Sequence, residues 1–358
     1  MPSPTKIPAI SIIIHVLVLH RGTHSLSLPQ NVTVPAIFFF GDSVVDPGNS
    51  DWILSVCRAD HPPYGRDFEG GIATGRFSNA KIPSDYAAQE FGVKELLPAY
   101  LDISLRTKDL LTGVSFAFTC SGYDPITSLI FQVPTLTDQL QHFREWQLKV
   151  KTAVGGKKAS YVISESVYLV VAGNNDFTFN YYGSLYRSLQ YNVSSYCDLL
   201  LTFASTFLQE LYNLGARRIG VIGLPPQGCL PAMRTSAEGH SRPCNKQYNQ
   251  NAMLFNSKLE SLMGSLGKNL PGAKLVYLDL YGSLLQLVKN PEKFGFTIAN
   301  RGCCGQGETE VSFICSPFDP RTCKNDSKYV FWDAYHPTDA ACKIIVHKML
   351  SKTINKFF

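Results

Sequence analysis

The chain has 358 residues, of which 45% are hydrophobic and 17% are charged. The 33 Lys and Arg residues exceed the 28 Asp and Glu residues, which gives a formal net charge of +5 without any basic block. This composition excludes a disordered chain, the length excludes a disulfide miniprotein, and the lack of a sustained period excludes collagen-like and coiled-coil folds. Nucleic acid is not expected as a partner, because no basic stripe is present.

The first 25 residues have the pattern of a secretory signal peptide. A single basic residue, Lys6, precedes an apolar run over residues 7–19, and small residues follow it. The run is short and is interrupted by Pro, Ser and His residues, so an uncleaved signal anchor is the less favoured alternative. We expect cleavage before Leu26, one domain over residues 26–358, and no stable membrane span.

Short apolar runs alternate with helical patterns along the rest of the chain. The alternation predicts, in chain order, strand 36–40, helix 82–91, strand 114–118, helix 136–150, strand 167–172, helix 196–214, strand 218–223, helix 248–266, strand 274–280 and helix 340–350. Parallel strands need crossover connections, so we expect an α/β fold with helices on both faces of a central five-stranded parallel sheet. Functional loops should gather at the carboxyl ends of its strands.

Glycosylation acceptors and cysteines agree with export. Asn31, Asn192 and Asn325 each begin an Asn-x-Ser/Thr sequence without proline in the middle. Ten cysteines suit an oxidising compartment, and four of them lie in one late segment. These four are Cys303, Cys304, Cys315 and Cys323. Zinc binding is the alternative for this cluster, but regular ligand pairs are lacking, so disulfides of undetermined pairing are favoured. We expect a secreted, extracellular protein.

A serine follows the first predicted strand. The sequence Phe40-Gly41-Asp42-Ser43 places the serine at the carboxyl end of that strand, after a glycine that permits a tight turn. The hydroxyl can then face solvent and act as a nucleophile. The alternative is that Asp42 and Ser43 only cap the following segment. The nearby Asp46 is interpreted as a loop residue and not as part of a carboxylate pair.

A serine nucleophile needs a general base and a carboxylate that orients the base. Asp333 and His336 lie three residues apart near the C-terminus. On a turn, the carboxylate can bind Nδ1 of the imidazole and leave Nε2 free for Ser43. The other histidines beyond residue 25 lie in helical patterns or in loops without an acid at comparable spacing; they are His61, His142, His240 and His347. His336 is therefore the predicted base.

A third polar sequence, Gly173-Asn174-Asn175-Asp176, follows the third predicted strand. An asparagine amide at a strand's carboxyl end can donate to the oxyanion of a tetrahedral intermediate. A plain turn is the alternative, because Asn and Asp favour turns.

Together these sequences resemble the plant secreted GDSL-type esterase/lipase family of the SGNH hydrolase superfamily, from about Pro35 to the C-terminus. Its first block corresponds to residues 39–46, with valine where the family name has leucine, its third block to 173–176 and its fifth to 333–336. Residues 62–68, 74–79, 224–229 and 302–305 are also similar to the plant family. A general α/β-hydrolase is less favoured, because no Gly-x-Ser-x-Gly elbow occurs in the sequence.

The resemblance implies a role for each site residue. Ser43 is implied as the nucleophile, His336 as the general base and acid, and Asp333 as the carboxylate that orients it. The N–H of Ser43 and the side chain of Asn175 are implied as oxyanion donors. The implied fold is a three-layer flavodoxin-like sandwich, which agrees with the alternation of strands and helices.

The second family block departs from this pattern. The family has a run similar to Phe-Ala-Ser-Gly-Gly-x-Gly-Tyr, whereas residues 116–123 carry Thr119 and Cys120 at the glycine pair, and the donor glycine falls on Cys120. The backbone N–H is retained, but a side chain resists positive φ, and a thiol could block the oxyanion hole. If Cys120 is a free thiol, at least one of the other nine cysteines must also lack an intrachain partner.

Losing one oxyanion donor typically lowers turnover by ~10²–10³-fold, so a slow esterase is favoured over an inert protein. We expect a monomeric serine esterase or lipase that hydrolyses carboxylic esters through an acyl-enzyme, without a metal or organic cofactor. Two alternatives stay open. One is an acyltransferase with the same triad, and the other is a non-catalytic protein that retains the ester-binding cleft. The resemblance does not narrow the acyl or alcohol group of the ester.

Overall fold

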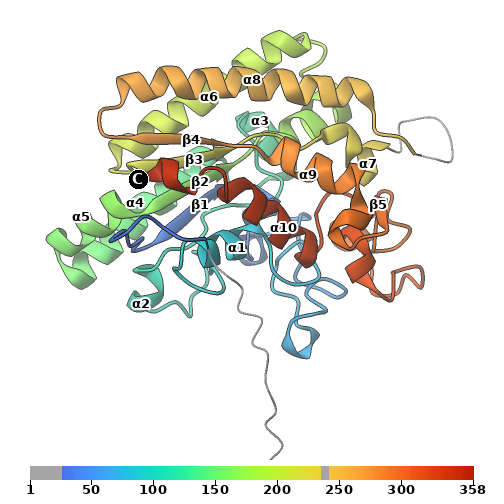
Figure 1. The fold of residues 1–358 in the computed structure, drawn as a ribbon, viewed down its shortest axis with the longest axis horizontal. Helices are drawn as coiled ribbons and strands as arrows, with labels where there is room; N and C mark the ends of the chain where they lie inside the picture. The colour runs from blue at the N-terminus through green and yellow to red at the C-terminus, as the bar shows by residue number, and fades with distance from the viewer. Residues whose placement is uncertain (1–25, 235–241) are drawn as a thin grey trace, which may run out of the picture.

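A computed structural model of the protein describes residues 26–234 and 242–358, so the predicted signal peptide lies outside the described residues. Four parallel strands form a central sheet in the order β1-β2-β3-β4 (Figure 1). They are β1 (Ile37–Gly41), β2 (Val167–Val171), β3 (Arg218–Ile222) and β4 (Lys274–Leu278). A separate pair of parallel strands, β5 (Ile298–Gly302) and β6 (Tyr329–Phe331), was not expected from the sequence.

Helices connect the strands, and every helix that the sequence predicts is present. The α-helices in the described residues are α1 (Pro83–Glu90), α2 (Thr107–Leu110), α3 (Pro125–Phe131), α4 (Leu136–Val154), α5 (Gly156–Glu165), α6 (Val193–Asn213), α7 (Pro231–Arg234), α8 (Lys246–Asn269), α9 (Leu280–Lys289) and α10 (Asp339–Leu350). A π-helical segment, Asp176–Gly183, follows β2. The predicted strand 274–280 ends early, because Leu280 begins α9.

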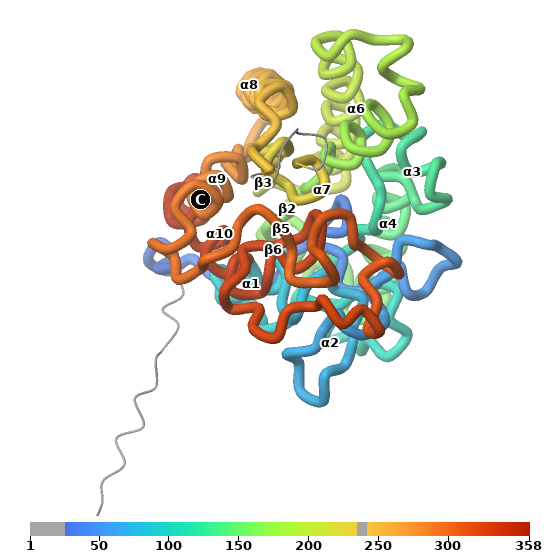
Figure 2. Tube along the Cα trace, turned by 90° about the vertical axis from the view of Figure 1, so that its right-hand side faces the viewer, coloured from blue at the N-terminus to red at the C-terminus, as the bar shows by residue number. Residues whose placement is uncertain are grey.

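Side chains of the sheet alternate between two hydrophobic cores. Phe38 and Phe40 of β1 pack in a core with α4, α5, α6 and α8, whereas Ile37 and Phe39 pack in a core with α1, α9 and α10. This alternation follows from the two-residue period of a strand. Figure 2 shows α4 and α6 on one side of the strands and α9 and α10 on the other. The three-layer α/β arrangement predicted from the sequence is therefore confirmed.

The central sheet has four strands, so the expectation of a fifth is wrong. The predicted strand 114–118 does run beside β1, where Phe116 N donates to Phe39 O at 2.8 Å. Phe118 N donates to Gly41 O at 3.1 Å, but Gly41 N donates to the Gln139 side chain at 2.8 Å and not to this segment, so the ladder is incomplete at Gly41. Residues 114–118 therefore cover the outer edge of β1 through one isolated bridge, Phe39–Ser115, and backbone hydrogen bonds, without forming a regular strand.

Capping side chains set where the long helices begin. Thr135 accepts a hydrogen bond from Asp138 N, and Asp138 accepts one from Thr135 N, which is the capping box at the start of α4. Asn192, Asn245 and Thr338 cap α6, α8 and α10 through their side-chain oxygens. Thr338 lies two residues after His336, so this cap fixes the start of α10 close to the predicted base.

Candidate active site

The nucleophile candidate lies where β1 ends. Gly41 has φ of 133°, and a Cβ atom there would lie 1.8 Å from the carbonyl oxygen of Val171 on β2. Only glycine fits this approach, and the next residue, Asp42, donates its N–H to the same oxygen at 3.0 Å. The Asp42 side chain accepts from Val44 N at 3.1 Å, so it does cap the following turn, Ser43–Val45. Ser43 is thereby fixed at the carboxyl edge of the sheet.

The structure brings Ser43, His336 and Asp333 together. Ser43 Oγ lies 2.8 Å from His336 Nε2, although 293 positions separate the two residues. His336 Nδ1 lies 2.9 Å and 2.8 Å from the two carboxylate oxygens of Asp333. Because the carboxylate only accepts hydrogen bonds, we assign the proton to Nδ1, which leaves Nε2 to accept from the serine hydroxyl. Asp333 is fully buried, and Ser43 and His336 are only 8% and 6% exposed.

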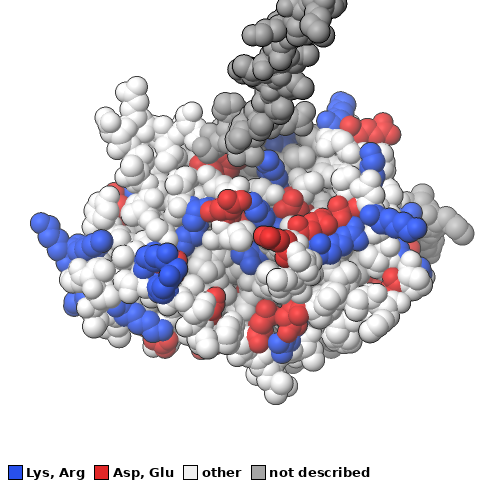
Figure 3. All heavy atoms as spheres, turned by 90° about the horizontal axis from the view of Figure 1, so that it is seen from below, with Lys and Arg blue, Asp and Glu red and all other residues white. Residues whose placement is uncertain are grey.

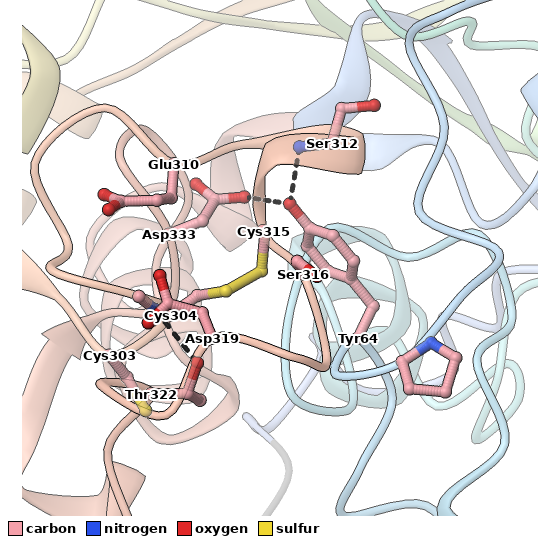
Figure 4. The surroundings of a disulfide bond; sticks show 12 residues. Tyr64, Cys303, Cys304, Glu310, Ser312, Cys315, Ser316, Asp319, Thr322 and Asp333 are labelled. Atoms are coloured by element: carbon pink, nitrogen blue, oxygen red, sulfur yellow. Dashed lines mark hydrogen bonds between the residues drawn. A yellow bond between two sulfur atoms is a disulfide. The ribbon is translucent and has the colours of Figure 1, made fainter.

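Backbone and side-chain donors hold the carboxylate of Asp333. Its Oδ1 accepts from Tyr335 N and His336 N, both at 2.8 Å. Its Oδ2 accepts from the hydroxyl of Tyr64 at 2.8 Å, and that hydroxyl in turn accepts from Ser312 N at 2.9 Å (Figure 4). Burial raises the pKa of Tyr64 well above its ordinary value, so the hydroxyl remains a donor.

Tyr64 and Ser312 support Asp333 but were not predicted from the sequence. Tyr64 lies in one of the segments similar to the plant family, but nothing in the sequence links it to a residue 269 positions away. Ser312 was missed for the same reason. Only the folded chain shows that these two residues support the carboxylate.

The turn that carries Asp333 and His336 packs on a disulfide-bonded segment. Cys303 pairs with Cys323 and Cys304 pairs with Cys315, so the late cysteines form disulfides as expected. Figure 4 shows the Cys304–Cys315 bond. Cys304 N donates to Trp332 O at 2.8 Å, and Trp332 N donates to His336 O at 2.7 Å.

Among the described residues, no group of three His, Cys, Asp or Glu is placed to hold a metal ion.

Asn175 faces the same cavity as Ser43. Its Nδ2 donates to Ser121 O at 2.9 Å, and because an amide carries two N–H groups, one is left for a ligand. The next residue, Asp176, accepts from Tyr123 N at 2.8 Å and joins this loop to residues 121–124. Burial raises the pKa of Asp176 to about 7. The third and second family blocks are thus held together at the cavity.

Cys120 adopts a left-handed conformation, which is unfavourable for a residue with a side chain. Its φ is 62°, and it lines the cavity with Ser43 and Asn175. It is not a free thiol, because it forms a disulfide with Cys57. The two unpaired cysteines are Cys197 and Cys342, both buried. Cys120 therefore adopts the positive φ that a glycine at this position would adopt without strain.

Comparison with known proteins adds the family. The model of the GDSL-like lipase/acylhydrolase family matches residues 37–349. The GDSL esterase/lipase At5g42170 of Arabidopsis thaliana is 47% identical over 336 residues, which cover 94% of this chain and 90% of that protein. The GDSL esterase/lipase EXL3 of the same plant is 43% identical, with 96% and 94% covered. The chain belongs to the GDSL-like lipase/acylhydrolase family.

Among solved structures, phospholipase A1 from Streptomyces albidoflavus NA297 aligns with 91% of this GDSL chain and all of its own, at a TM-score of 0.37 and 13% identity. That likeness is too remote to support a statement about substrate or mechanism.

The cavity of this GDSL protein has a volume of about 160 Å³ and is lined mainly by apolar side chains. The ring centroids of Phe77 and His336 lie 4.7 Å apart, and Phe131 and Phe179 also line the cavity. At its rim, Phe313 is 67% exposed and Val56 is 63% exposed. Such a lining suits the apolar part of an ester.

Charge on the GDSL protein is dispersed over the face seen from below, where residues of both signs are interspersed (Figure 3). No helix among the described residues is long and apolar enough to cross a membrane. The predicted glycosylation acceptors Asn31, Asn192 and Asn325 are all exposed. Their side chains are therefore open to modification, although Asn192 and Asn325 also accept local hydrogen bonds.

Proposed function

We propose that this protein is a serine esterase or lipase that hydrolyses carboxylic esters through an acyl-enzyme on Ser43. The observation that carries the proposal is the continuous chain of contacts from Ser43 Oγ through the His336 imidazole to the Asp333 carboxylate. Membership of the GDSL family and the apolar cavity beside Ser43 support it.

In the acylation step, His336 Nε2 takes the proton of Ser43 Oγ while the oxygen attacks the ester carbonyl. The negative charge that develops on the carbonyl oxygen is stabilised by the N–H groups of Ser43 and Cys120 and by the free N–H of the Asn175 amide. His336 then gives its proton to the leaving alcohol. Water, activated by the same imidazole, attacks the acyl-enzyme and releases the acid.

Asp333 orients the imidazole and stabilises its protonated form. The carboxylate is fully buried, so its charge acts at short range in a medium of low dielectric constant. Its four hydrogen-bond donors, including Nδ1 of His336, keep it from rotating away. The proton position that leaves Nε2 as the base is thereby maintained through the catalytic cycle.

Replacing the nucleophile tests the proposal. We expect Ser43→Ala to lower hydrolysis of a chromogenic short-chain ester by more than ~10³-fold and to abolish labelling by a fluorophosphonate. Ser257→Ala, on the exposed face of α8, is the matched control and should keep wild-type turnover. Wild-type turnover in Ser43→Ala would overturn the proposal, and a wild-type protein that neither turns over nor labels would favour a non-catalytic ester-binding protein.

Secretion and glycosylation stay predictions, and we propose both for this chain. The support is the signal-like sequence of residues 1–25 together with the exposure of Asn31, Asn192 and Asn325. A protein expressed in plant cells should appear in the medium and gain electrophoretic mobility on endoglycosidase treatment. Retention in the cell without a mobility change would contradict both predictions.

A monomeric state is likewise expected and is checked by light scattering.

A further inference from the structure

We propose that the Cys57–Cys120 disulfide is a positioning element of the oxyanion hole, and that turnover therefore depends on its redox state. The bond holds residue 120 in a left-handed conformation that glycine adopts unaided. This inference rests on the proposed esterase function, but its test below separates the two.

The conformation of Cys120 is unfavourable for a residue with a side chain. Its φ of 62° lies in the left-handed region, where Cβ approaches the following carbonyl oxygen. Such a conformation persists only where the surroundings enforce it, and such positions concentrate at functional sites. Here Cys120 lines the cavity that contains Ser43. The disulfide is the one covalent contact of its side chain.

The residue that follows Cys120 is hydrogen-bonded to the oxyanion donor Asn175 and to Gly41, just before the turn that carries Ser43. The carbonyl of Ser121, one residue after Cys120, accepts a hydrogen bond from the Asn175 amide at 2.9 Å, so the Ser121–Gly122 peptide sets the direction of that amide. The hydroxyl of Ser121 donates to Gly41 O at 2.6 Å, next to the nucleophile turn. A rotation of residue 120 would therefore move both its own N–H and the hydrogen-bond partner of Asn175.

The segment at Cys57 has anchors of its own. Thr119 Oγ1 donates to Cys57 O at 2.6 Å, which adds a hydrogen bond to the covalent link between the two segments. Ser312 Oγ donates to Val56 O at 2.7 Å, and Ser312 N donates to Tyr64. The segment at Cys57 is therefore fixed by Ser312, which also contacts the Tyr64 hydroxyl that supports Asp333. The disulfide in turn restrains Cys120 relative to this segment.

Reduction would release residue 120. A small dithiol transfers two electrons to the disulfide: the S–S bond breaks, each of the two cysteines takes up one proton, and the dithiol closes to its own cyclic disulfide. Cys120 is only partly buried and borders the cavity, so a small reductant can reach the bond. Residue 120 can then relax towards a right-handed conformation, which turns its N–H away from the oxyanion position.

The experiment compares Cys57→Ser with the double variant Cys57→Ser/Cys120→Gly. We expect Cys57→Ser to lower kcat by about 10–100-fold with little change in KM, because the oxyanion is stabilised mainly in the transition state. The double variant should recover kcat to within about 3-fold of wild type, because glycine tolerates positive φ without the bridge. Dithiol treatment, at a concentration that leaves the Cys303–Cys323 and Cys304–Cys315 bonds oxidised, should lower the kcat of the wild type but not that of the double variant.

The control is Cys229→Ser/Cys244→Ser, which removes a disulfide whose cysteines do not line the cavity. Its kcat per folded molecule should match the wild type, with the folded fraction taken from near-ultraviolet circular dichroism. Wild-type kcat in Cys57→Ser would overturn the inference, and so would an equal loss in the single and double variants. If Cys57→Ser does not fold, reduced wild type takes its place in the comparison. Ester hydrolysis by the oxidised wild type, and its loss in Ser43→Ala, test only the proposed function.

Discussion

The two halves of the candidate active site are held by different kinds of interaction. Ser43 and Asn175 follow β1 and β2, neighbouring strands of the central sheet whose register pairs Gly41 with Val171. Asp333 and His336 instead follow β6, a strand of three residues in a separate two-stranded sheet. Side-chain hydrogen bonds and two disulfides hold that second half.

This difference indicates where each half is vulnerable. The nucleophile half depends on backbone packing at strand ends, where there is no room for an extra atom. The base half depends on individual side-chain contacts made over long distances in the sequence. We therefore expect a methyl group to disrupt the first half and the loss of a hydroxyl or carboxylate to impair the second.

The largest effect is expected for Asp333→Asn. The amide can present an N–H to Nδ1 and favour the tautomer that cannot accept the serine proton, so kcat should fall by ~10³–10⁴-fold. This corresponds to about 4–5.5 kcal/mol of transition-state stabilisation. Steady-state hydrolysis of a chromogenic ester measures it. Asp319→Asn, whose carboxylate contacts Arg321 in the disulfide-bonded segment, is the control and should keep wild-type kcat.

Gly41→Ala tests the nucleophile half. The added methyl group would overlap the Val171 carbonyl, so we expect a loss of about 4 kcal/mol or more in the free energy of unfolding, or no folded protein. Gly264→Ala on α8 is the matched control, because nothing lies within 4 Å of its added Cβ, and it should gain about 0.5–1 kcal/mol. Denaturant unfolding measures both, and equal stability of the two variants would contradict the steric argument.

Tyr64→Phe tests the base half at its most distant contact. Removing the hydroxyl leaves Asp333 Oδ2 and Ser312 N without this partner, which should cost about 1–3 kcal/mol of stability. We also expect kcat to fall by about 3–30-fold, because the carboxylate is less firmly oriented. Tyr161→Phe, at a half-exposed tyrosine on α5, should change neither quantity. Unchanged kcat in Tyr64→Phe would show that the backbone donors suffice to orient Asp333.

The smallest effect is a pH dependence in the nucleophile half. Asp51 lies in the short turn Asn49–Trp52, which follows the turn that carries Ser43. Burial, with the nearby Asp46 and Asp60, raises the pKa of Asp51 to about 7. Between pH 4 and 7 the folded protein therefore keeps a proton that the unfolded chain has released, so stability falls as pH rises through this window. Asp51→Asn removes this pH-dependent loss of stability. The difference in melting temperature, variant minus wild type, should therefore be larger at pH 8 than at pH 5 by about a few degrees.

The base half provides the control for this pH dependence. Hydrogen bonds from Arg321 lower the pKa of Asp319 to about 2, below the window, so Asp319→Asn should differ from wild type by the same amount at pH 5 and pH 8. If the melting-temperature difference from wild type changed equally between pH 5 and pH 8 in both variants, the pH dependence could not be assigned to Asp51.

Much of the fold and of the site could be predicted because the relevant patterns are local. Apolar periodicity predicted four sheet strands and the long helices, and Gly41, Ser43, Asp333 and His336 stand in short motifs whose spacing suits their chemistry. The prediction of a fifth strand was wrong because hydrophobic periodicity does not reveal that the Gln139 side chain accepts the hydrogen bond of Gly41 N. β5 was missed because its residues, Ile298–Gly302, do not form an apolar run, and β6 was missed because it has only three residues.

The sequence by itself determined which residue types are available for the candidate site and the approximate positions of the four sheet strands and the long helices, since these depend on neighbours within a few positions. Only the tertiary structure decided which residues support them: Tyr64 beside Asp333, and Cys57 bonded to Cys120. These partners lie 269 and 63 positions apart, and a contact over such a separation depends on the path of the whole chain and on how the two cores pack. Local preferences do not contain that information.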